Sequence, residues 1–216
     1  MDGILLVDKP KGWTSFDVVA KVRGIIKTEL RKTNPAIKNV KVGHTGTLDP
    51  SATGLLVLCI GKYTKKVPDM IRHDKTYDVE MTLGASSTTG DQEGQITKVE
   101  LTDIPKDSLE AVLRSFLGEQ MQTPPVFSAI KVNGKRAYDL ARAGKEVKLE
   151  PRKCTIHSIE LKNYDGVRAS FTANVSSGTY IRSLVEDIGS KLGTHAYMSE
   201  LRRIRIADYT IEGAMT

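Results

Sequence analysis

HTGTLDPSATGLLVLCIG, residues 44–61, places one acidic residue, Asp49, in a segment of Gly, Thr, Ser and Pro that leads directly into an apolar run. The run LLVLCIG has the length and composition of a strand buried on both faces, so it predicts a central strand. Gly43 and Gly46 permit tight turns, and Pro50 biases Asp49 toward an extended conformation. We expect Asp49 in a loop just before a core strand, where it either caps a turn or takes part in chemistry.

The segments nearest to this stretch predict a helix and two further strands. GILLVD, residues 3–8, has strand length, and FDVVAKVRGIIKTEL, residues 16–30, has an apolar helical face after Ser15, a candidate N-cap. Residues 31–46 are polar and contain Pro and Gly, which predicts a loop. TYDVEMTLGA, residues 76–85, alternates like a half-buried strand and leads to a loop or hairpin tip at SSTTGDQEGQ.

The second half of the chain predicts two more helices and a hairpin. One helix has Pro105 at its first position and ends at Gly118, and the other lies in SGTYIRSLVEDIGSKLG, residues 177–193. Asp165-Gly166 separates two strand-like runs, a strong hairpin signal. We therefore predict an α+β fold in which helices flank a mixed, largely antiparallel sheet. The expected inward side chains of the helices are Val18, Val22, Ile25, Ile26 and Leu30; Leu109, Val112, Leu113, Phe116 and Leu117; and Ile181, Leu184, Val185, Ile188 and Leu192.

Composition limits the class of protein. The 216 residues, 39% of them apolar, suffice for a buried core, either in one domain or in a body with a small appendage. Neither a signal peptide nor an 18-residue apolar stretch is present, so we expect a cytoplasmic protein. Cys59 and Cys154 lie far apart in strand-like runs and are expected to be buried free thiols. The net charge of +6 favours a polyanionic partner.

Residues 124–152 form a basic segment bounded by prolines, which we interpret as an excursion from the main body. It contains a short predicted helix near RAYDLARAG, closed by Gly144. Its basic residues are Lys131, Lys135, Arg136, Arg142, Lys145 and Lys148.

Two other side chains are candidates for function. Arg182 lies in the first turn of a predicted helix, an unfavourable position for a cation unless a carboxylate or phosphate is near or the side chain points into solvent. Tyr77 begins a strand between charged residues, where it is either an ordinary core or rim residue or a functional one.

Several of these segments, taken in order, resemble the TruB family of tRNA pseudouridine synthases, and the resemblance extends over residues 3–210. The matching segments are GILLVDKPKGWTS, VGHTGTLDPSATGLLVLCIG, KTYDVEMTLGASSTTGD, QTPPVFSAIKVNGKRAYDLARAG, SSGTYIRSLVEDIGSKLG and LRRIRIADY. The resemblance implies the pseudouridine synthase fold and isomerisation of uridine to pseudouridine at position 55 in the T loop of tRNA.

The resemblance also implies roles for individual residues. Asp49 matches the nucleophile, Tyr77 and Arg182 match the active-site tyrosine and arginine, and Leu201 matches an apolar pocket residue. His44 matches the histidine that takes the place of the flipped-out nucleotide; the alternative is a histidine bound within a turn. Lys9 and Pro10 match a pair expected to support the site. The residues expected to contact RNA are Thr179 and Tyr180; Lys131, Lys135, Arg136 and Arg142 of the basic segment, which matches the insertion that clamps the T arm; and Arg202, with Arg203 and Arg205, as a second basic strip.

The reaction breaks the C1′–N1 glycosidic bond, rotates the base and rejoins it through C5. No redox change or phosphoryl transfer occurs, so we expect no cofactor and no metal, and the sequence has no phosphate loop or metal-ligand spacing. Asp49 can act as a nucleophile or stabilise the sugar cation, and an adjacent Arg182 favours its charged form. Tyr77 can stack on the base or accept the C5 proton. The expected partner is the T arm of tRNA, with no membrane, no obligate protein partner and a monomeric state.

Two departures and two alternatives accompany this interpretation. The expected single catalytic domain, residues 1–216, lacks the C-terminal PUA-type domain of most bacterial members, so we expect weaker contact with the acceptor end of tRNA. Phe127 replaces a tyrosine found in many relatives, which puts a hydroxyl role there in doubt. The alternatives are an RNA-guided pseudouridine synthase subunit and a non-catalytic protein that binds or folds RNA. The direct tRNA-holding insertion argues against the first, and Asp49, Tyr77 and Arg182 together argue against the second.

Overall fold

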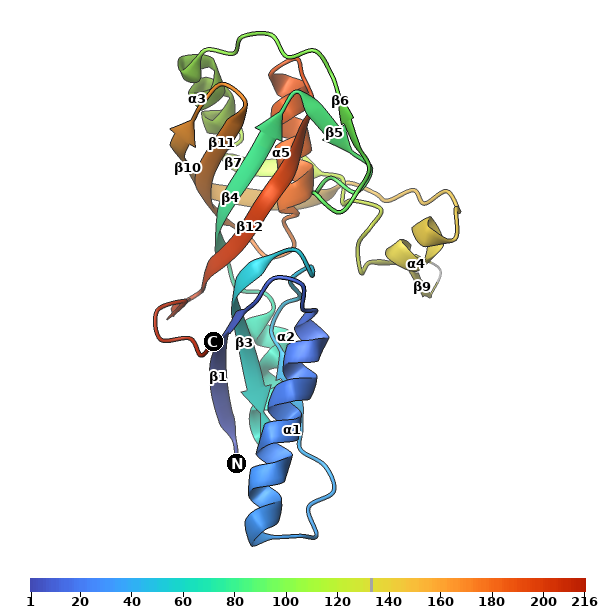
Figure 1. The fold of residues 1–216 in the computed structure, drawn as a ribbon, viewed down its shortest axis with the longest axis vertical. Coiled ribbons are helices and arrows are strands. Elements are labelled where there is room, and N and C mark those ends of the chain that lie inside the picture. The colour runs from blue at the N-terminus through green and yellow to red at the C-terminus, as the bar shows by residue number, and fades with distance from the viewer. Residues whose placement is uncertain (133) are drawn as a thin grey trace. The chain divides into compact units, whose positions relative to one another are not determined.

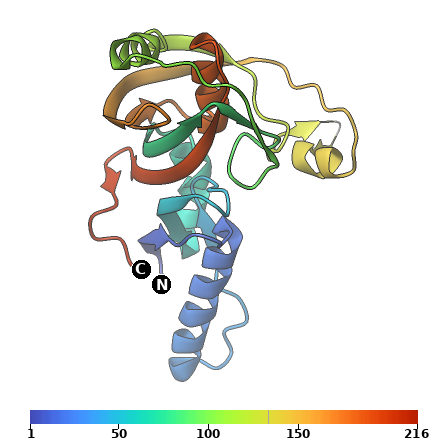
Figure 2. The ribbon, with the colours of Figure 1, turned by 45° about the horizontal axis from the view of Figure 1, so that its top comes forward.

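A computed structural model describes residues 1–132 and 134–216 (Figures 1 and 2). The chain divides into a first unit, residues 1–77 and 201–216, and a second unit, residues 78–200. Strands β4 (Lys75–Leu83) and β12 (Ala196–Ile206) contribute residues to both units. The predicted α+β class is confirmed.

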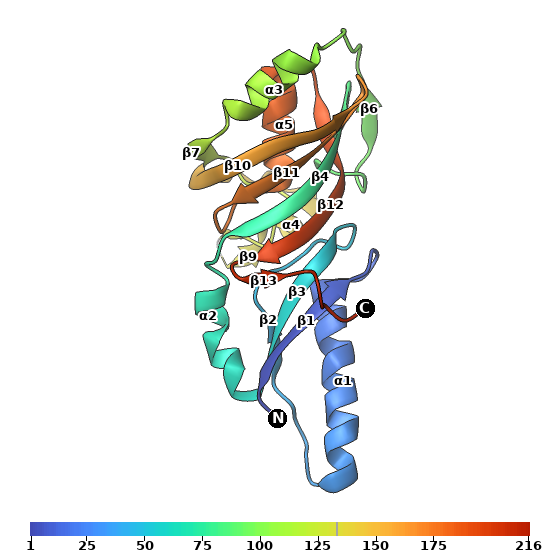
Figure 3. The same cartoon turned by 90° about the vertical axis from the view of Figure 1, so that its left-hand side faces the viewer.

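The first unit is built around β3 (Thr53–Ile60), the strand predicted from LLVLCIG. It pairs antiparallel with β1 (Gly3–Lys9) and β2 (Val42–His44), and parallel with the end of β12, which in turn pairs with β13 (Tyr209–Thr210). One face of β3 packs on α1 (Ser15–Thr33) through Val18, Val19 and Ile26, and its other face packs on Met70 of α2 (Val67–Met70). Figure 3 shows β1 and β3 between α1 and α2. β3 is therefore buried on both faces, as its unbroken apolar sequence requires.

Gly54 is the residue that allows β3 and β12 to meet. Its φ is +101°, and a Cβ built there would lie 2.3 Å from the carbonyl oxygen of Arg203, its partner in the parallel pairing. No side chain fits at this distance. The glycine at position 54 is thus required by a close approach of two backbones.

Three details of the first unit correct the sequence prediction. The N-cap of α1 is Thr14, which forms a capping box with Asp17, and not Ser15. Ile25 is 53% exposed because it lies off the apolar stripe of α1. Residues 42–44, predicted as loop, pair with β3 as β2, and the short segment η1 (Gly61–Lys66) follows β3.

In the second unit the strand order is β12-β4-β11-β10-β7. β10 (Arg152–Tyr164) and β11 (Arg168–Val175) form the hairpin predicted at Asp165-Gly166, and β10 also pairs antiparallel with β7 (Gly118–Gln122). β5 (Ala85–Ser87) and β6 (Ile96–Lys98) form a small hairpin, so the segment predicted as a loop or hairpin tip is a hairpin tip. Helix α3 (Lys106–Arg114) contacts β10 and α5 (Ile181–Lys191).

The helices of the second unit differ from prediction at their ends. Pro105 is the N-cap of α3 and not its first residue, and α3 ends at Arg114 because Gly118, with φ +90°, turns the chain into β7. Leu117 is consequently 44% exposed, and Leu192 is half-buried at the end of α5.

The predicted basic segment carries β8 (Lys131–Val132), β9 (Lys135–Arg136) and α4 (Ala137–Arg142), and Gly144 follows α4 with φ +68°. Figure 1 shows α4 and β9 to one side of the sheet of the second unit. Residue 133, inside this segment, lies outside the described residues.

Two predictions made from composition can also be compared with the structure. Cys59 and Cys154 are buried free thiols, as expected, and burial raises the pKa of both. Within the described part of the chain, no helix has the length and apolar character needed to cross a membrane.

Candidate active site

Asp49 lies in the loop between β2 and β3, half-buried, as the sequence predicted. Its carbonyl oxygen accepts a hydrogen bond from the Ala52 N–H at 3.1 Å, which closes a turn immediately before β3. Three buried polar side chains, which come from β1, α1 and β12, form hydrogen bonds to the backbone of the loop 45–52. These are Lys9, Ser15 and Arg203.

Lys9 supports the loop from the end of β1. Its side chain is fully buried, and its ammonium group donates to the carbonyl oxygens of Trp13 at 2.6 Å, Pro10 at 2.9 Å and Pro50 at 3.3 Å. The Gly12 N–H also donates to Pro50 O, at 2.8 Å. Buried charges require such partners. The residue after Asp49 is therefore tied to the KPKGW turn.

Ser15 holds the residue before Asp49. Its hydroxyl oxygen accepts from the Leu48 N–H at 2.8 Å, and the hydroxyl lies 3.1 Å from Leu48 O, to which it donates. Ser15 is 2% exposed. Because both backbone groups of Leu48 are engaged by one side chain, the first turn of α1 fixes the approach to Asp49.

Arg203 is 1% exposed, which corrects its assignment to a basic strip that contacts RNA. It donates to Leu55 O at 2.8 Å, Gly46 O at 3.0 Å and Thr47 O at 3.5 Å. The guanidinium thus joins β12 to both sides of the Asp49 loop. It also places a buried positive charge next to the backbone of the loop.

His44 precedes the loop and is half-buried. The Gly46 N–H donates to its Nδ1 at 3.3 Å, so the turn hydrogen bond considered from the sequence is present. Burial, and then the charge of Arg203, lower the pKa of His44. The imidazole is therefore neutral at pH 7.

Lys75, at the start of β4, is a further buried cation near this loop. Its ammonium group donates to Ile71 O at 2.9 Å and to His73 O, and the side chain is 3.5 Å from the Cβ position of Gly46. Burial, and then the charge of Arg203, lower the pKa of Lys75 to about 8. The ordinary value is 10.5.

This depressed pKa predicts a pH-dependent stability. Between about pH 8 and 10.5 the unfolded chain binds more protons at Lys75 than the folded chain, so stability rises with pH by up to about 1.4 kcal/mol per unit. Relative to Lys75→Met, wild type should gain about 1.6 kcal/mol between pH 8 and 9.5 in urea unfolding. Lys21→Met, at an exposed lysine of α1, serves as the control. The difference in stability between wild type and Lys21→Met should not change over this pH range. Parallel stability curves for wild type and Lys75→Met would contradict the prediction.

Tyr77 is the last residue of the first unit before the second unit begins, and Leu201 is the first residue after the second unit ends. Tyr77 is 8% exposed, on the same face of β4 as Lys75, Val79 and Met81. Leu201 is half-buried in β12, two residues before Arg203.

Arg182 is buried in the second unit, so the alternative of a solvated side chain is wrong. Nη1 lies 3.7 Å from Asp91 Oδ2 and donates to Thr89 O at 3.1 Å, and Nη2 donates to Phe127 O at 2.9 Å. Asp91 is therefore a carboxylate of the kind that an arginine in the first turn of a helix requires nearby. Asp91 was not predicted from the sequence, although its place in the Gly-containing TTGDQEG segment was a usable signal.

The start of α5 is fixed by β7. Gln122 accepts from the Tyr180 N–H at 2.7 Å and donates to Tyr180 O at 3.0 Å, and the Ser183 hydroxyl donates to Thr123 O at 2.8 Å. Thr179 donates to Ser176 O at 2.9 Å. These contacts orient Arg182 because they hold the residues on both sides of it.

The basic side chains predicted to contact RNA lie in different environments. Lys131, Lys135, Arg136 and Arg142 are exposed, and Arg142 lies over the Tyr138 ring at 5.7 Å. Arg202 forms a two-pronged ion pair with Asp8, at 2.6 and 3.1 Å, so much of its charge is neutralised. Phe127 contacts Arg182 through its backbone carbonyl, and that contact does not require a hydroxyl at position 127.

Comparison with known proteins places the chain in a family. Residues 32–181 match the model described as "TruB family pseudouridylate synthase (N terminal domain)", and residues 182–216 match "tRNA pseudouridylate synthase B C-terminal domain". The tRNA pseudouridine synthase B of Aquifex aeolicus (strain VF5) is 46% identical over 218 residues, covering 100% of this chain and 72% of that protein. Its counterpart in Cupriavidus metallidurans is 45% identical, covering 99% of this chain and 65% of the relative. The chain thus spans about two thirds of the length of such relatives.

Two solved structures are also similar. One is "Crystal Structure of a Cbf5-Nop10-Gar1 Complex", with a TM-score of 0.70 and 32% identity over 96% of this chain and 50% of that one. The other is "Structure of H/ACA RNP bound to a substrate RNA containing 2'-deoxyuridine", with a TM-score of 0.66 and 30% identity over 96% of this chain and 48% of that one. With both family models matched in sequence order over residues 32–216, the chain belongs to the TruB family of pseudouridylate synthases.

Proposed function

We propose that this chain isomerises uridine to pseudouridine at position 55 in the T loop of tRNA. The observation that carries the proposal is the loop of Asp49, in which Lys9, Ser15 and Arg203 hold the residues before and after the carboxylate. Such support from a rigid scaffold is what a nucleophile requires. Relatives that match the whole chain are named tRNA pseudouridine synthase B.

In the proposed reaction the Asp49 carboxylate forms a bond to the substrate as the C1′–N1 bond breaks. The base then rotates, and a C1′–C5 bond forms as the bond between Asp49 and the substrate breaks. N1 gains a proton and C5 loses one, so no redox partner is needed. Arg182 favours the charged form of Asp49, and Tyr77 stacks on the base or accepts the C5 proton. Asp91 supports this role because it holds the Arg182 guanidinium.

Base extrusion is the costly step of binding, since a stacked uridine must leave its neighbours. We propose that His44 fills the vacated position and that Leu201 contacts the extruded base. A neutral imidazole supports this role because a charged ring would cost more to remove from water.

An RNA-guided subunit is the second candidate, and similarity to the Cbf5-Nop10-Gar1 and H/ACA RNP structures favours it. The curated tRNA enzymes are more similar, at 45–46% identity against 30–32%. The exposed basic insertion, with Lys131, Lys135, Arg136 and Arg142, supports direct contact with the T arm. We therefore favour the stand-alone enzyme.

The test is release of tritium from tRNA labelled at C5 of its uridines, with no guide RNA present. Wild type should release one equivalent per tRNA, and none from a transcript in which uridine 55 is replaced by cytidine. Equal release from both transcripts would refute position 55 as the target. Binding without release from either would favour the guide-dependent or non-catalytic alternative.

A further inference from the structure

The positive charge of the chain is unevenly divided between its two units. The first unit has 17 Lys and Arg against nine Asp and Glu, a net charge of +8, and the second has 15 against 17, a net charge of −2. The insertion predicted to clamp RNA belongs to the net-acidic unit. The main source of attraction for a polyanion is therefore the first unit.

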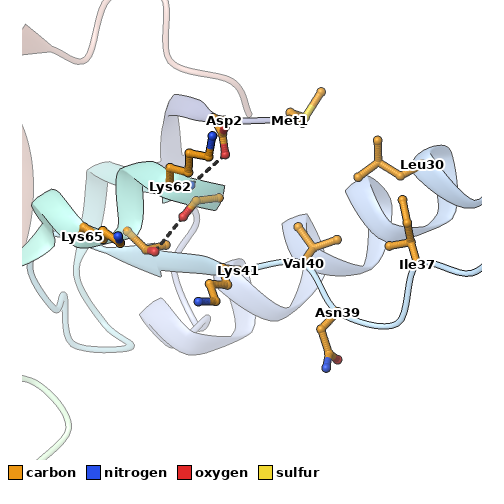
Figure 4. Close-up of a pocket in the computed structure, with 11 residues that line it drawn as sticks. Met1, Asp2, Leu30, Ile37, Asn39, Val40, Lys41, Lys62 and Lys65 are labelled. Carbon is orange, nitrogen blue, oxygen red and sulfur yellow. Dashed lines mark hydrogen bonds between the residues drawn. The ribbon is translucent and has the colours of Figure 1, made fainter. Parts of the chain in front are cut away.

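A hollow of about 390 Å³ lies within the first unit, where the start of β1, the start of η1 and the segment after α1 meet. Leu30, Ile37 and Val40 give it an apolar wall at one end, and Lys41, Lys62 and Lys65 lie at the other (Figure 4). An apolar surface beside several cations suits a ligand that combines a ring with a phosphate.

The backbone that carries these lysines is fixed. The Gly61 N–H donates to Lys41 O at 2.8 Å, and the Lys62 N–H donates to Asp2 Oδ1 at 2.7 Å (Figure 4). Gly61 has φ +61°, and a Cβ there would lie 1.9 Å from the Asp2 carboxylate. A glycine is needed for this approach, so the corner of the hollow is formed before any ligand arrives.

The three lysines are available to an anion. Their side chains are exposed, and none of the three forms an ion pair within residues 1–132 and 134–216. Asp2, the acidic residue of the lining, is engaged by the Lys62 backbone N–H.

The hollow is separate from the candidate active site. In the β1–β3 pairing, Gly3 is opposite Ile60 at the end near the hollow, and Lys9 is opposite Gly54 at the end near the Asp49 loop. Six steps along an antiparallel strand span about 20 Å. One RNA molecule can reach both places, but a single nucleotide cannot.

We infer that this hollow is a second RNA contact, in which a nucleotide about 20 Å from the reactive uridine rests its ribose and base on the apolar wall and its phosphates on Lys41, Lys62 and Lys65. The inference rests on the proposed function, because it takes tRNA as the ligand. On this inference, the net positive charge of the first unit serves to bind RNA and takes no part in the reaction.

The test compares wild type with the triple variant Lys41→Glu, Lys62→Glu, Lys65→Glu in binding to a full-length tRNA transcript over a series of salt concentrations. We expect affinity at 0.1 M salt to fall at least about tenfold and the slope of log affinity against log salt to decrease by about 2, which corresponds to two or three phosphate contacts. The matched control, Lys98→Glu, Lys106→Glu, Lys162→Glu in the second unit, changes the net charge equally. It should stay within about threefold of wild type.

A separate measurement distinguishes failure of this inference from failure of the proposed function. Turnover of a T-arm hairpin at saturating concentration tests the chemistry, and the triple variant should match wild type there, which also shows that it folds. If the charge reversal unfolds the chain, the three Lys→Gln replacements take its place with the same expected change of slope. An unchanged affinity and slope, or an equal loss in the control, would overturn the inference.

Discussion

The Asp49→Asn variant is expected to form no measurable pseudouridine, with a rate at least about 10⁴-fold below wild type, while its affinity for tRNA stays within about threefold. An amide is nearly the size of a carboxylate, but it is neutral and can neither attack C1′ nor stabilise a sugar cation. Because Lys9, Ser15 and Arg203 bind backbone groups of the loop, its conformation should survive the change. Tritium release and filter binding measure the two properties.

Asp69→Asn is the matched control, since Asp69 is an exposed aspartate of α2 in the same unit. It removes the same charge and should leave the rate unchanged. Residual activity of Asp49→Asn within tenfold of wild type would remove Asp49 from the mechanism. A loss of binding as large as the loss of rate would assign it to the RNA contact.

The Arg203→Met variant is expected to lose about 3 kcal/mol of stability or more. Removal of the guanidinium takes a donor from Leu55 O, which is buried, and from Gly46 O, which is partly buried, and a buried group left without a donor costs about 1–3 kcal/mol. The loop is then less firmly placed, and a displacement of about 1 Å can lower kcat by about 10²-fold. Urea unfolding and single-turnover kinetics give the two quantities.

Two comparisons separate this role from simple packing. Arg202→Met, at the neighbouring half-buried pair with Asp8, should cost about 1 kcal/mol or less. In Arg203→Met the pKa of His44, which burial and Arg203 hold down, should rise toward its ordinary value in an NMR titration. An unchanged His44 pKa together with a cost below about 1 kcal/mol would refute this role.

The elements with strong local patterns were predictable from the sequence. β3, the β10–β11 hairpin and the course of α1 follow from an unbroken apolar run, an Asp-Gly turn and a helical apolar stripe. β2 and β7 could not be predicted, since VGH and GEQMQ have no apolar pattern and become strands only because β3 and β10 provide partners. The cap of α1 was misplaced by one residue because Thr14 and Ser15 are equally suitable in isolation.

The residues of the candidate site were likewise predictable only where a local motif contains them. Asp49 and Lys9 lie in motifs that are readable locally, whereas Ser15 and Arg203 act on backbone groups 33 and 157 residues away. Arg203 looks like one of several exposed arginines in LRRIR. Only the pairing of β12 with Gly54 buries it, and no local pattern encodes that pairing.

The parallel contact between β3 and β12 also has a consequence for biosynthesis. Residues 1–77 emerge from the ribosome long before residues 201–216, yet Arg203 closes the loop at Gly46, and Met215 exchanges backbone hydrogen bonds with Leu6 and Asp8. Contacts of such high sequence separation form late in folding. The nascent chain therefore carries Asp49 in an unfinished loop while the second unit is being synthesised, and the loop is completed only when β12 has left the exit tunnel.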